Sequence, residues 1–337
     1  MGRTDITRSP TPRFDLLKLE DYLHVGIQFS RGCPFNCEFC DIIELYGRVP
    51  RTKSNEQVLT ELDALYALGY RGHVDFVDDN LIGNNLKRFL PDLQSWMNKK
   101  NFPFEFSTEA SINLADDPEL LSALGSANFF AIFVGIEGPD TETLVLMRKK
   151  QNIRRSLQES IYKIYGSGIF VLAGFIVGFD SEKGSTAEGM IECIEDTAIP
   201  VCTVGLLYAL PATQLGRRLL REGRLFPGYD APSPPDAGDQ CTIGLKFETK
   251  RPRRDVLADY RAVLAAVYSP AAYFGLVRRS GAGSAGSIHR RRMRCATSAR
   301  SFGWCGAYPV RVPEQLGNSG RPCSTAPSTT LGPCGFW

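Results

Sequence analysis

Short apolar runs alternate with longer amphipathic stretches from His24 to about residue 222. Six runs rich in β-branched and aromatic residues predict strands, at residues 24–30, 74–77, 104–108, 129–136, 170–178 and 203–210. Between them, apolar residues recur with a helical period and predict helices, at residues 55–68, 86–99, 118–124, 153–165 and 187–197. Strands that alternate with crossover helices form a parallel sheet. The pattern therefore predicts an α/β fold, with six βα units arranged as a complete or partial barrel.

The helix predicted at residues 55–68 has the clearest start signal. Ser54 precedes it and Gln57 stands at its third position, which is the capping-box pattern. Apolar residues follow at helical spacing, at Val58, Leu59, Leu62, Leu65 and Tyr66.

Polar residues stand where the predicted strands end. A cysteine-rich loop follows the first strand, and the later strands are followed by Asp78, Asp79, Asn80, Glu109, Glu137, Asp180, Tyr208 and Pro211. In a parallel barrel these strand ends meet at one mouth, where active sites lie. Each carboxylate is equally open to a second interpretation, as a helix cap or a solvated loop residue.

Beyond residue 222 the pattern changes twice. Prolines at residues 227–235 predict a stiffened connection, and residues 223–278 form an accessory region with one apolar helical face, at Val256, Leu257, Tyr260, Val263, Leu264 and Val267. Residues 279–337 are rich in Gly, Ser, Pro, Arg and Cys without a period, which predicts a disordered tail or a stretch read out of frame. The alternative is a basic nucleic-acid arm with a metal site. Its ligands would be four tail cysteines whose spacings fit no compact loop: Cys295, Cys305, Cys323 and Cys334.

Charge is uneven along the chain, although the formal net charge is only +2. Eight of the 39 basic residues but only one of the 37 acidic residues lie after residue 278, so the first 278 residues are net acidic by five. This argues against a nucleic-acid-binding body, which requires a basic face. The longest apolar run, residues 169–179, is too short to span a bilayer. With 43% hydrophobic residues, the composition predicts a soluble, cytoplasmic protein with no transmembrane segment.

Three cysteines, Cys33, Cys37 and Cys40, lie together in the loop after the first predicted strand. Their spacing predicts an iron–sulfur cluster with three protein thiolates, which leaves one iron free to bind another group. A zinc loop would need a fourth Cys or His at short spacing, and the next candidate, His73, lies beyond a predicted helix. A disulfide would leave one thiol over in a chain that shows no secretory leader.

Few other groups offer metal or acid–base chemistry. The chain has only three histidines, His24, His73 and His289, so imidazole does not carry a multi-ligand metal site. Cys193 and Cys202 lie in apolar patterns that are typical of buried, inert thiols.

The cysteine triplet, with an aromatic residue before its third member, resembles that of the radical S-adenosylmethionine (SAM) superfamily. Further segments are similar to the cobalamin-dependent branch that includes hopanoid methylases: PRFDLL at 12–17, QFSRGC at 28–33, CDII at 40–43, VDDNLIGN at 77–84, TEAS at 108–111, GIE at 135–137 and IVGFD at 176–180. The resemblance covers residues 11–277. The leader segment at residues 1–20 overlaps its beginning, and the tail at residues 279–337 lies beyond its end.

The resemblance implies a TIM-like partial (β/α)6 radical SAM barrel at residues 21–222, with two cofactors. Cys33, Cys37 and Cys40 would bind three irons of a [4Fe–4S] cluster, and SAM would chelate the fourth before its reductive cleavage. The resemblance also implies cofactor contacts from eight further positions, which are Phe39, Asp78, Asp79, Asn80, Glu109, Glu137, Ile176 and Leu210.

The implied function is methylation of an unactivated carbon of an apolar metabolite or lipid, with flavodoxin or ferredoxin as reductant and no catalytic residue assigned. The alternatives are a cobalamin-free radical oxidoreductase or cyclase, and a non-catalytic iron–sulfur electron carrier, which would not need polar residues at five further strand ends. Members of this branch carry a cobalamin-binding domain before the segment that matches Pro12, where about a dozen residues precede it here. The expectation is therefore a truncated fragment in which cobalamin is missing or supplied by another chain.

Overall fold

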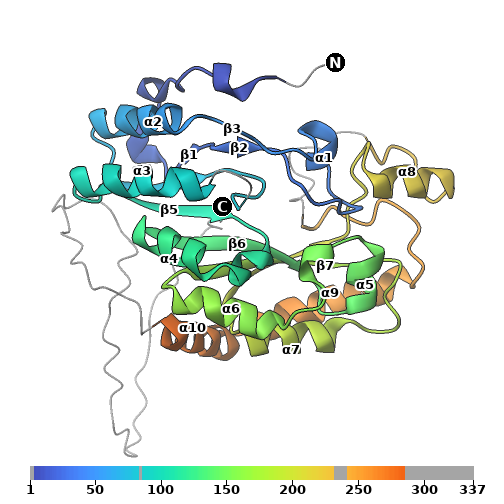
Figure 1. Ribbon diagram of the computed structural model, residues 1–337. Helices are drawn as coiled ribbons and strands as arrows, with labels where there is room; N and C mark the ends of the chain where they lie inside the picture. Colours follow the sequence, from blue (N-terminus) through green and yellow to red (C-terminus); the bar gives the residue numbers. More distant parts are fainter. Residues whose placement is uncertain (1–3, 83–85, 231–240, 285–337) are drawn as a thin grey trace, which may run out of the picture. The chain divides into compact units, whose positions relative to one another are not determined.

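A six-stranded parallel sheet organises the computed structural model, which describes residues 4–82, 86–230 and 241–284 (Figure 1). The strands neighbour one another in sequence order: β1 (Val25–Ile27), β4 (Gly72–Phe76), β5 (Phe104–Glu109), β6 (Phe129–Glu137), β7 (Phe170–Val177) and β8 (Val201–Leu206). Each strand pairs in parallel with the next. Within the described part of the chain, the end strands β1 and β8 do not pair with each other, so the barrel is partial. The predicted six-stranded α/β fold is confirmed, and each strand overlaps its predicted run.

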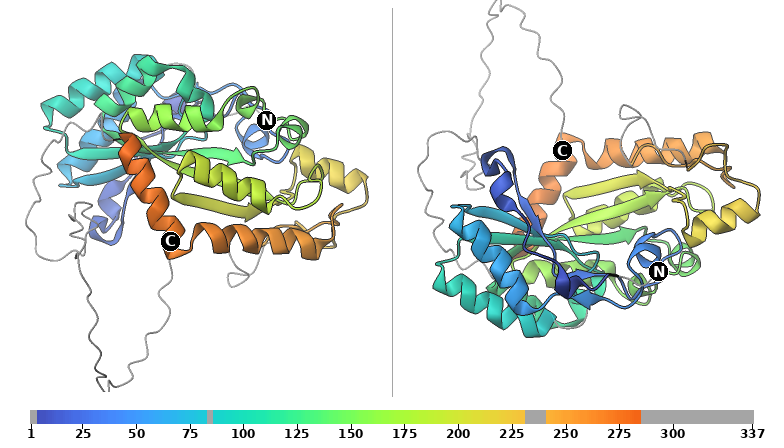
Figure 2. Two further views of the ribbon diagram at one scale, coloured as in Figure 1. Left: turned by 90° about the horizontal axis from the view of Figure 1, so that it is seen from below. Right: turned by 90° about the horizontal axis from the view of Figure 1, so that it is seen from above.

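Helices connect the strands and pack on the sheet. They are α2 (Asn55–Ala67), α3 (Leu86–Lys99), α4 (Pro118–Ser126), α5 (Thr141–Leu146), α6 (Leu157–Gly166) and α7 (Ala187–Thr197). Figure 2 shows the teal to green helices α3, α4 and α6 along one side of the curved sheet. Of the predicted helices, α6 begins later than residue 153, because the Ser156 hydroxyl accepts a hydrogen bond from the Glu159 N–H (3.1 Å) and caps the helix there.

Alternation along the strands decides which face meets the helices. Phe76, Phe106 and Phe129 are buried together, with their ring centroids 5.3 Å apart in each pair. They belong to one core with the apolar faces of α2 and α3, and each such side chain contributes about 1.5–3 kcal/mol on burial. Successive side chains of a strand point to opposite faces. His73 and Ser107 therefore lie on the other face of the sheet, where His73 Nε2 and Ser107 Oγ are 2.6 Å apart.

Several short elements were not predicted. The strands β2 (Ser30–Arg31) and β3 (Arg51–Thr52) form an antiparallel pair, and α1 (Ile42–Leu45), α5 and α8 (Gln214–Arg221) are additional helices. Single 3₁₀ turns lie at Ile6–Arg8, Phe14–Leu16, Leu19–Asp21, Ile112–Asp116 and Lys150–Asn152. Most of these elements are shorter than the window in which hydrophobic periodicity can be recognised.

The accessory region contains two further helices. Val256, Val263 and Val267 are buried on α9 (Arg253–Val267), which confirms the predicted apolar face. The second helix, α10 (Pro270–Ser284), continues past residue 279, where the tail was expected to begin. Leu276 and Ser280 of this helix are buried, and Arg279 donates a hydrogen bond to the Glu195 carbonyl of α7 (2.9 Å), so the last turns of α10 pack on the rest of the domain.

The remaining predictions for the C-terminal part fall outside the described residues. These are the proline-rich stretch from residue 231 and the tail from residue 285, with Cys295, Cys305, Cys323 and Cys334. In the ranges that the structure describes, no helix is both long enough and apolar enough to cross a membrane.

We expect Ser54→Ala to lower the free energy of unfolding by about 1 kcal/mol. The Ser54 hydroxyl accepts a hydrogen bond from the Gln57 N–H (3.2 Å), and Gln57 Oε1 accepts one from the Ser54 N–H (3.0 Å), so the change leaves a helix N–H without its partner. Urea denaturation would measure the loss. Ser122→Ala, at an exposed position inside α4, is the matched control and should change stability by no more than about 0.5 kcal/mol. Equal losses in both variants would contradict the capping role.

Candidate functional site

The three predicted ligand cysteines occupy one loop between β2 and α1. Cys37 is buried, whereas Cys33 and Cys40 are partly exposed. The loop begins at Gly32, whose φ of +103° favours glycine and where a Cβ would lie 2.8 Å from the Gly47 carbonyl oxygen. The same carbonyl accepts a hydrogen bond from the Cys33 N–H (3.1 Å). The turn therefore holds the first cysteine against the chain that returns from the loop.

Two carboxylates after β4 hold the chain that leads into this loop. Asp78 is buried and accepts hydrogen bonds from the backbone N–H groups of Phe29 (2.9 Å) and Ser30. Asp79 accepts one from the Gly32 N–H (3.1 Å). Burial raises the pKa of Asp78 to about 6, although its hydrogen bonds with Ser30 and Phe29 act in the opposite direction. Both residues therefore position the cysteine loop, and Asp78 uses both of its carboxylate oxygens to do so.

Two buried amide side chains lie beside the thiols with unused hydrogen-bonding atoms. Asn80 Oδ1 accepts hydrogen bonds from the Ser111 N–H (3.0 Å) and hydroxyl (3.1 Å), whereas Asn80 Nδ2 is buried without a hydrogen bond of good geometry. Burial raises the pKa of the Cys33 thiol, and the Asn80 side chain acts to lower it. Gln151 Nε2 lies 3.7 Å from Cys37 Sγ, and Gln151 Oε1 is also buried without a partner. Buried polar atoms in folded proteins are nearly always paired. A bound group with polar atoms beside the loop would satisfy both amides.

A buried ion pair also lies near the thiols. Lys149 Nζ is 2.5 Å from Glu137 Oε1, and both side chains are largely shielded from water. Gly135 makes room for the pair, since a Cβ there would lie 2.5 Å from Glu137 Oε1 and 2.8 Å from Lys149 Nζ. Burial acts to lower the pKa of Lys149, but the charges of Glu137 and Cys37 outweigh it, so the pKa is raised. Lys149 is therefore a buried cation next to the cysteine loop.

Glu109, at the end of β5, is a predicted carboxylate whose side chain reaches solvent. The surrounding protein nevertheless raises the pKa of Glu109 to about 7 by desolvation, and the charges of Asp75, Asp79 and Asp78 add to the rise. Lys149 acts in the opposite direction. Glu109 can therefore take up or release a proton near neutral pH.

The predicted apolar positions are spread around the same strand ends. The Phe39 ring centroid lies 6.0 Å from that of Phe179 and 5.9 Å from Lys149 Nζ. Ile176 of β7 and Glu137 line one cavity of about 260 Å³. Leu210 lies in the turn before α8, where its carbonyl accepts a hydrogen bond from the Thr213 hydroxyl (2.7 Å).

The cysteine thiols are not gathered around a single point. In the part of the chain that the structure describes, no three His, Cys, Asp or Glu side chains lie close enough to hold one metal ion. A cubane cluster places each cysteine on a different iron, so it does not require the three sulfurs to converge. Burial raises the pKa of Cys33, and it raises the pKa of Cys40 to about 12. Metal binding at this loop must therefore displace thiol protons.

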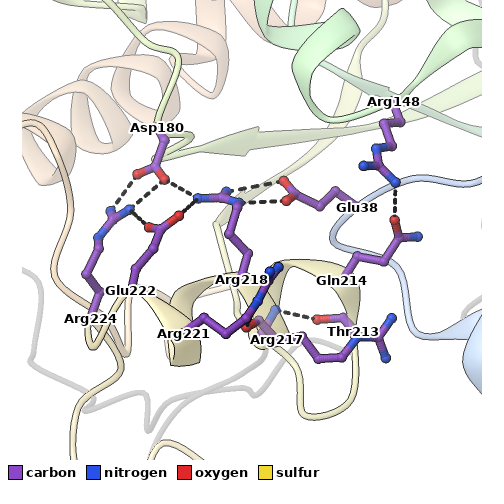
Figure 3. Close-up of polar contacts among 11 residues, drawn as sticks. Glu38, Arg148, Asp180, Thr213, Gln214, Arg217, Arg218, Arg221, Glu222 and Arg224 are labelled. Carbon is purple, nitrogen blue, oxygen red and sulfur yellow. Dashed lines mark hydrogen bonds and ion pairs between the residues drawn. The ribbon is translucent and has the colours of Figure 1, made fainter.

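Several residues of the site were missed or misjudged from the sequence. Lys149 and Gln151 lie in a run of charged and polar residues that is typical of an exposed loop, and no periodic signal marks them as buried. Asp180 is predicted at the barrel mouth, either as a site residue or as a helix cap or solvated loop residue, and the sequence does not indicate an ion pair. Its oxygens instead lie 2.8 Å from Arg218 Nη1 and 2.6 Å from Arg224 Nη2, so two arginines occupy it (Figure 3).

Two family models match the chain. Residues 27–194 match the radical SAM superfamily, and residues 213–298 match a domain of unknown function. The chain is 46% identical over 273 residues to an uncharacterised methyltransferase of Synechocystis sp., which covers 80% of this chain and 50% of that protein. It is 45% identical over 225 residues to the hopanoid C-2 methylase of Rhodopseudomonas palustris, which covers 66% of this chain and 43% of the methylase. The chain thus spans about half the length of these curated relatives.

A solved structure shares the fold. The cobalamin-dependent S-adenosylmethionine radical enzyme OxsB, with aqua-cobalamin and SAM bound, superposes with a TM-score of 0.60 at 16% identity. The superposition covers 84% of this chain and 49% of the OxsB chain. The similarity to the hopanoid C-2 methylase confirms the resemblance to hopanoid methylases, and the superposition with OxsB confirms the fold.

We expect Lys149→Met to lower the free energy of unfolding by about 3–5 kcal/mol, because it leaves the Glu137 carboxylate buried without its cation. Chemical denaturation would measure the loss. Replacing both partners, Lys149→Met with Glu137→Gln, should cost less than the single change. Lys150→Met, at the adjacent exposed position, is the control and should change stability by no more than about 0.5 kcal/mol. A double variant as unstable as the sum of the two single variants would show that the pair is not coupled.

Proposed function

Because residues 27–194 of this chain belong to the radical SAM superfamily, we propose that it binds a [4Fe–4S] cluster through Cys33, Cys37 and Cys40 and uses it with SAM. The proposed reaction is methylation of an unactivated carbon of an apolar metabolite or lipid. The observation that carries the proposal is one braced loop with three thiols, next to the unpaired amide atoms of Asn80 and Gln151. The chemistry of this donor set fits a cluster that retains an open coordination position.

The cluster, when bound, supplies the single electron that breaks a carbon–sulfur bond of SAM. The residues of this chain prepare the site for it. Asp78 and Asp79 hold the entry to the cysteine loop in place, and Lys149 balances part of the thiolate charge. These roles need no side chain of tuned pKa at the reacting carbon.

The SAM contacts are also part of the proposal. Asn80 Nδ2 and the exposed Glu109 carboxylate are available to the polar groups of SAM. Asp79 and Glu137 lie at the same strand ends, but Asp79 is bonded to the Gly32 N–H and Glu137 is paired with Lys149. We therefore propose that they hold the site in shape and set its charge, and that they do not contact SAM. Phe39, Ile176 and Leu210 would supply apolar surface that keeps water from the reacting groups.

The methyl-transfer part of the proposal is supported by the two curated relatives, one named as a methyltransferase and the other as a hopanoid C-2 methylase. The apolar substrate class is supported by the hopanoid methylase alone. Cobalamin is included as a further cofactor because OxsB, which shares the fold, is described as cobalamin-dependent. A low-potential electron donor such as flavodoxin or ferredoxin would complete the system.

We expect the anaerobically reconstituted protein to show the visible absorption of an iron–sulfur cluster and to release 5′-deoxyadenosine from SAM under a strong reductant. Cys37→Ala should abolish both signals, because it removes the buried thiol of the loop. Cys193→Ala is the control: that thiol is also buried, but it lies on α7 and should be dispensable for both signals.

The outcomes separate the candidate functions. An intact cluster without any nucleoside release would favour an electron carrier, and equal activity with and without cobalamin would favour a cobalamin-free radical enzyme. Retention of the cluster in Cys37→Ala would contradict the assignment of the ligands.

A further inference from the structure

Glu38 lies between two of the proposed ligands, Cys37 and Cys40, and its side chain turns toward α8 (Figure 3). Arg218 of α8 binds both of its carboxylate oxygens, with Nε 2.7 Å from Oε1 and Nη2 3.2 Å from Oε2. A two-bond contact of this kind is stronger and more directional than a single one. Residues 37–40, which we call the cysteine segment, are therefore attached to a residue 180 positions away from Glu38 in the sequence.

The Arg218 guanidinium is itself held by a network of charges. Arg218 Nη1 lies 2.8 Å from Asp180 Oδ2, and Arg224 bonds both oxygens of Asp180 at 2.6 and 2.7 Å. Glu222 contacts both arginines, at 3.3 and 2.8 Å (Figure 3). The Asp180 and Arg224 side chains are only 12% and 14% exposed, which separates this network from surface ion pairs that contribute little.

The backbone on either side of Glu38 is held as well. The Leu215 N–H at the start of α8 donates to the Glu38 carbonyl (2.9 Å), and the Glu38 N–H donates to the Met147 carbonyl (2.9 Å). Gln214, the first residue of α8, donates from its Nε2 to Asn36 Oδ1 (2.9 Å). The start of α8 therefore binds the loop at Asn36 and at the Glu38 carbonyl, and Arg218 binds the Glu38 side chain.

We propose that α8 is a clamp for the cysteine segment and that Arg218 is its positioning residue. The inference rests on the function proposed above, because the clamp acts on the cluster ligands. It gives a role to the beginning of residues 213–298, which match a domain of unknown function. That role is to keep Cys37 and Cys40 in the orientation in which each binds its own iron.

The charges of the clamp provide a readout that loop disorder alone would not produce. Glu38, which follows Cys37 in the chain, carries a negative charge, and Arg218, which is paired with it, carries a positive one. Loss of a positive charge near a metal centre disfavours its reduced form, and loss of a negative charge favours that form. Arg218→Ala should therefore lower the midpoint potential, whereas Glu38→Gln should raise it.

The experiment measures iron release to a chelator and the midpoint potential in reconstituted full-length protein under anaerobic conditions. Outer-shell partners of metal ligands commonly change metal affinity by about 10- to 100-fold. We expect iron release to be faster by about that factor in Arg218→Ala and in Glu38→Gln. Arg218→Lys should fall between wild type and Arg218→Ala, because lysine keeps the charge but cannot bind two carboxylates as a planar fork.

Arg221→Ala is the matched control, since Arg221 lies exposed on the same helix and donates a hydrogen bond to the Arg217 carbonyl (3.3 Å). It should release iron at the wild-type rate. If circular dichroism shows that Arg218→Ala is unfolded, the iron release and midpoint potential of Glu38→Gln decide alone. This change leaves Arg218 bonded to Asp180, so it should not unfold the protein.

The possible failures are distinct. A wild-type protein that binds no iron and sulfide would overturn both the proposed function and the clamp. Wild-type iron release in both Arg218→Ala and Glu38→Gln, or potentials that do not move in opposite directions, would overturn the clamp alone.

Discussion

Everything at the site depends on holding a loop that has little regular secondary structure of its own. The backbone N–H groups of such a loop must find acceptors, because buried unpaired groups are costly. Here they are found in other elements: Asp78 and Asp79 accept from the chain before Cys33, and the Gly47 carbonyl accepts from Cys33 itself. Polar residues at the strand ends therefore hydrogen-bond to the cysteine loop and the chain before it. Only the strand-end groups that these hydrogen bonds do not use are available to a ligand.

The fold could be predicted from the sequence because its signals are local. Short runs rich in β-branched and aromatic residues located all six strands, and Ser54 with Gln57 marked the start of α2. The cysteine loop was recognised in the same way, from spacing within a short segment. Residues whose role arises from contacts distant in the sequence could not be found. Lys149 looks like part of a solvated run, and only the fold brings it 2.5 Å from Glu137.

Strand-end polar residues turned out to divide into two groups. Asp78 and Asp180 are used inside the protein, by backbone N–H groups in one case and by two arginines in the other. Glu109 reaches solvent, and Asn80 keeps an unpaired amide atom. The sequence pattern placed all four residues correctly at the same edge of the sheet. It does not show which of them are paired with other groups of the protein. That distinction depends on which long side chains, such as Arg218, reach the edge from elsewhere.

The 180-residue separation between Glu38 and Arg218 has a consequence for biosynthesis. The chain leaves the ribosome from its N-terminal end, and the strands of the sheet follow one another in sequence order. The cysteine loop emerges near the beginning of synthesis, whereas α8 emerges only after β8. The contacts between α8 and the cysteine loop can therefore form only after translation has passed residue 221, so the bracing of this loop is a late step in making the domain.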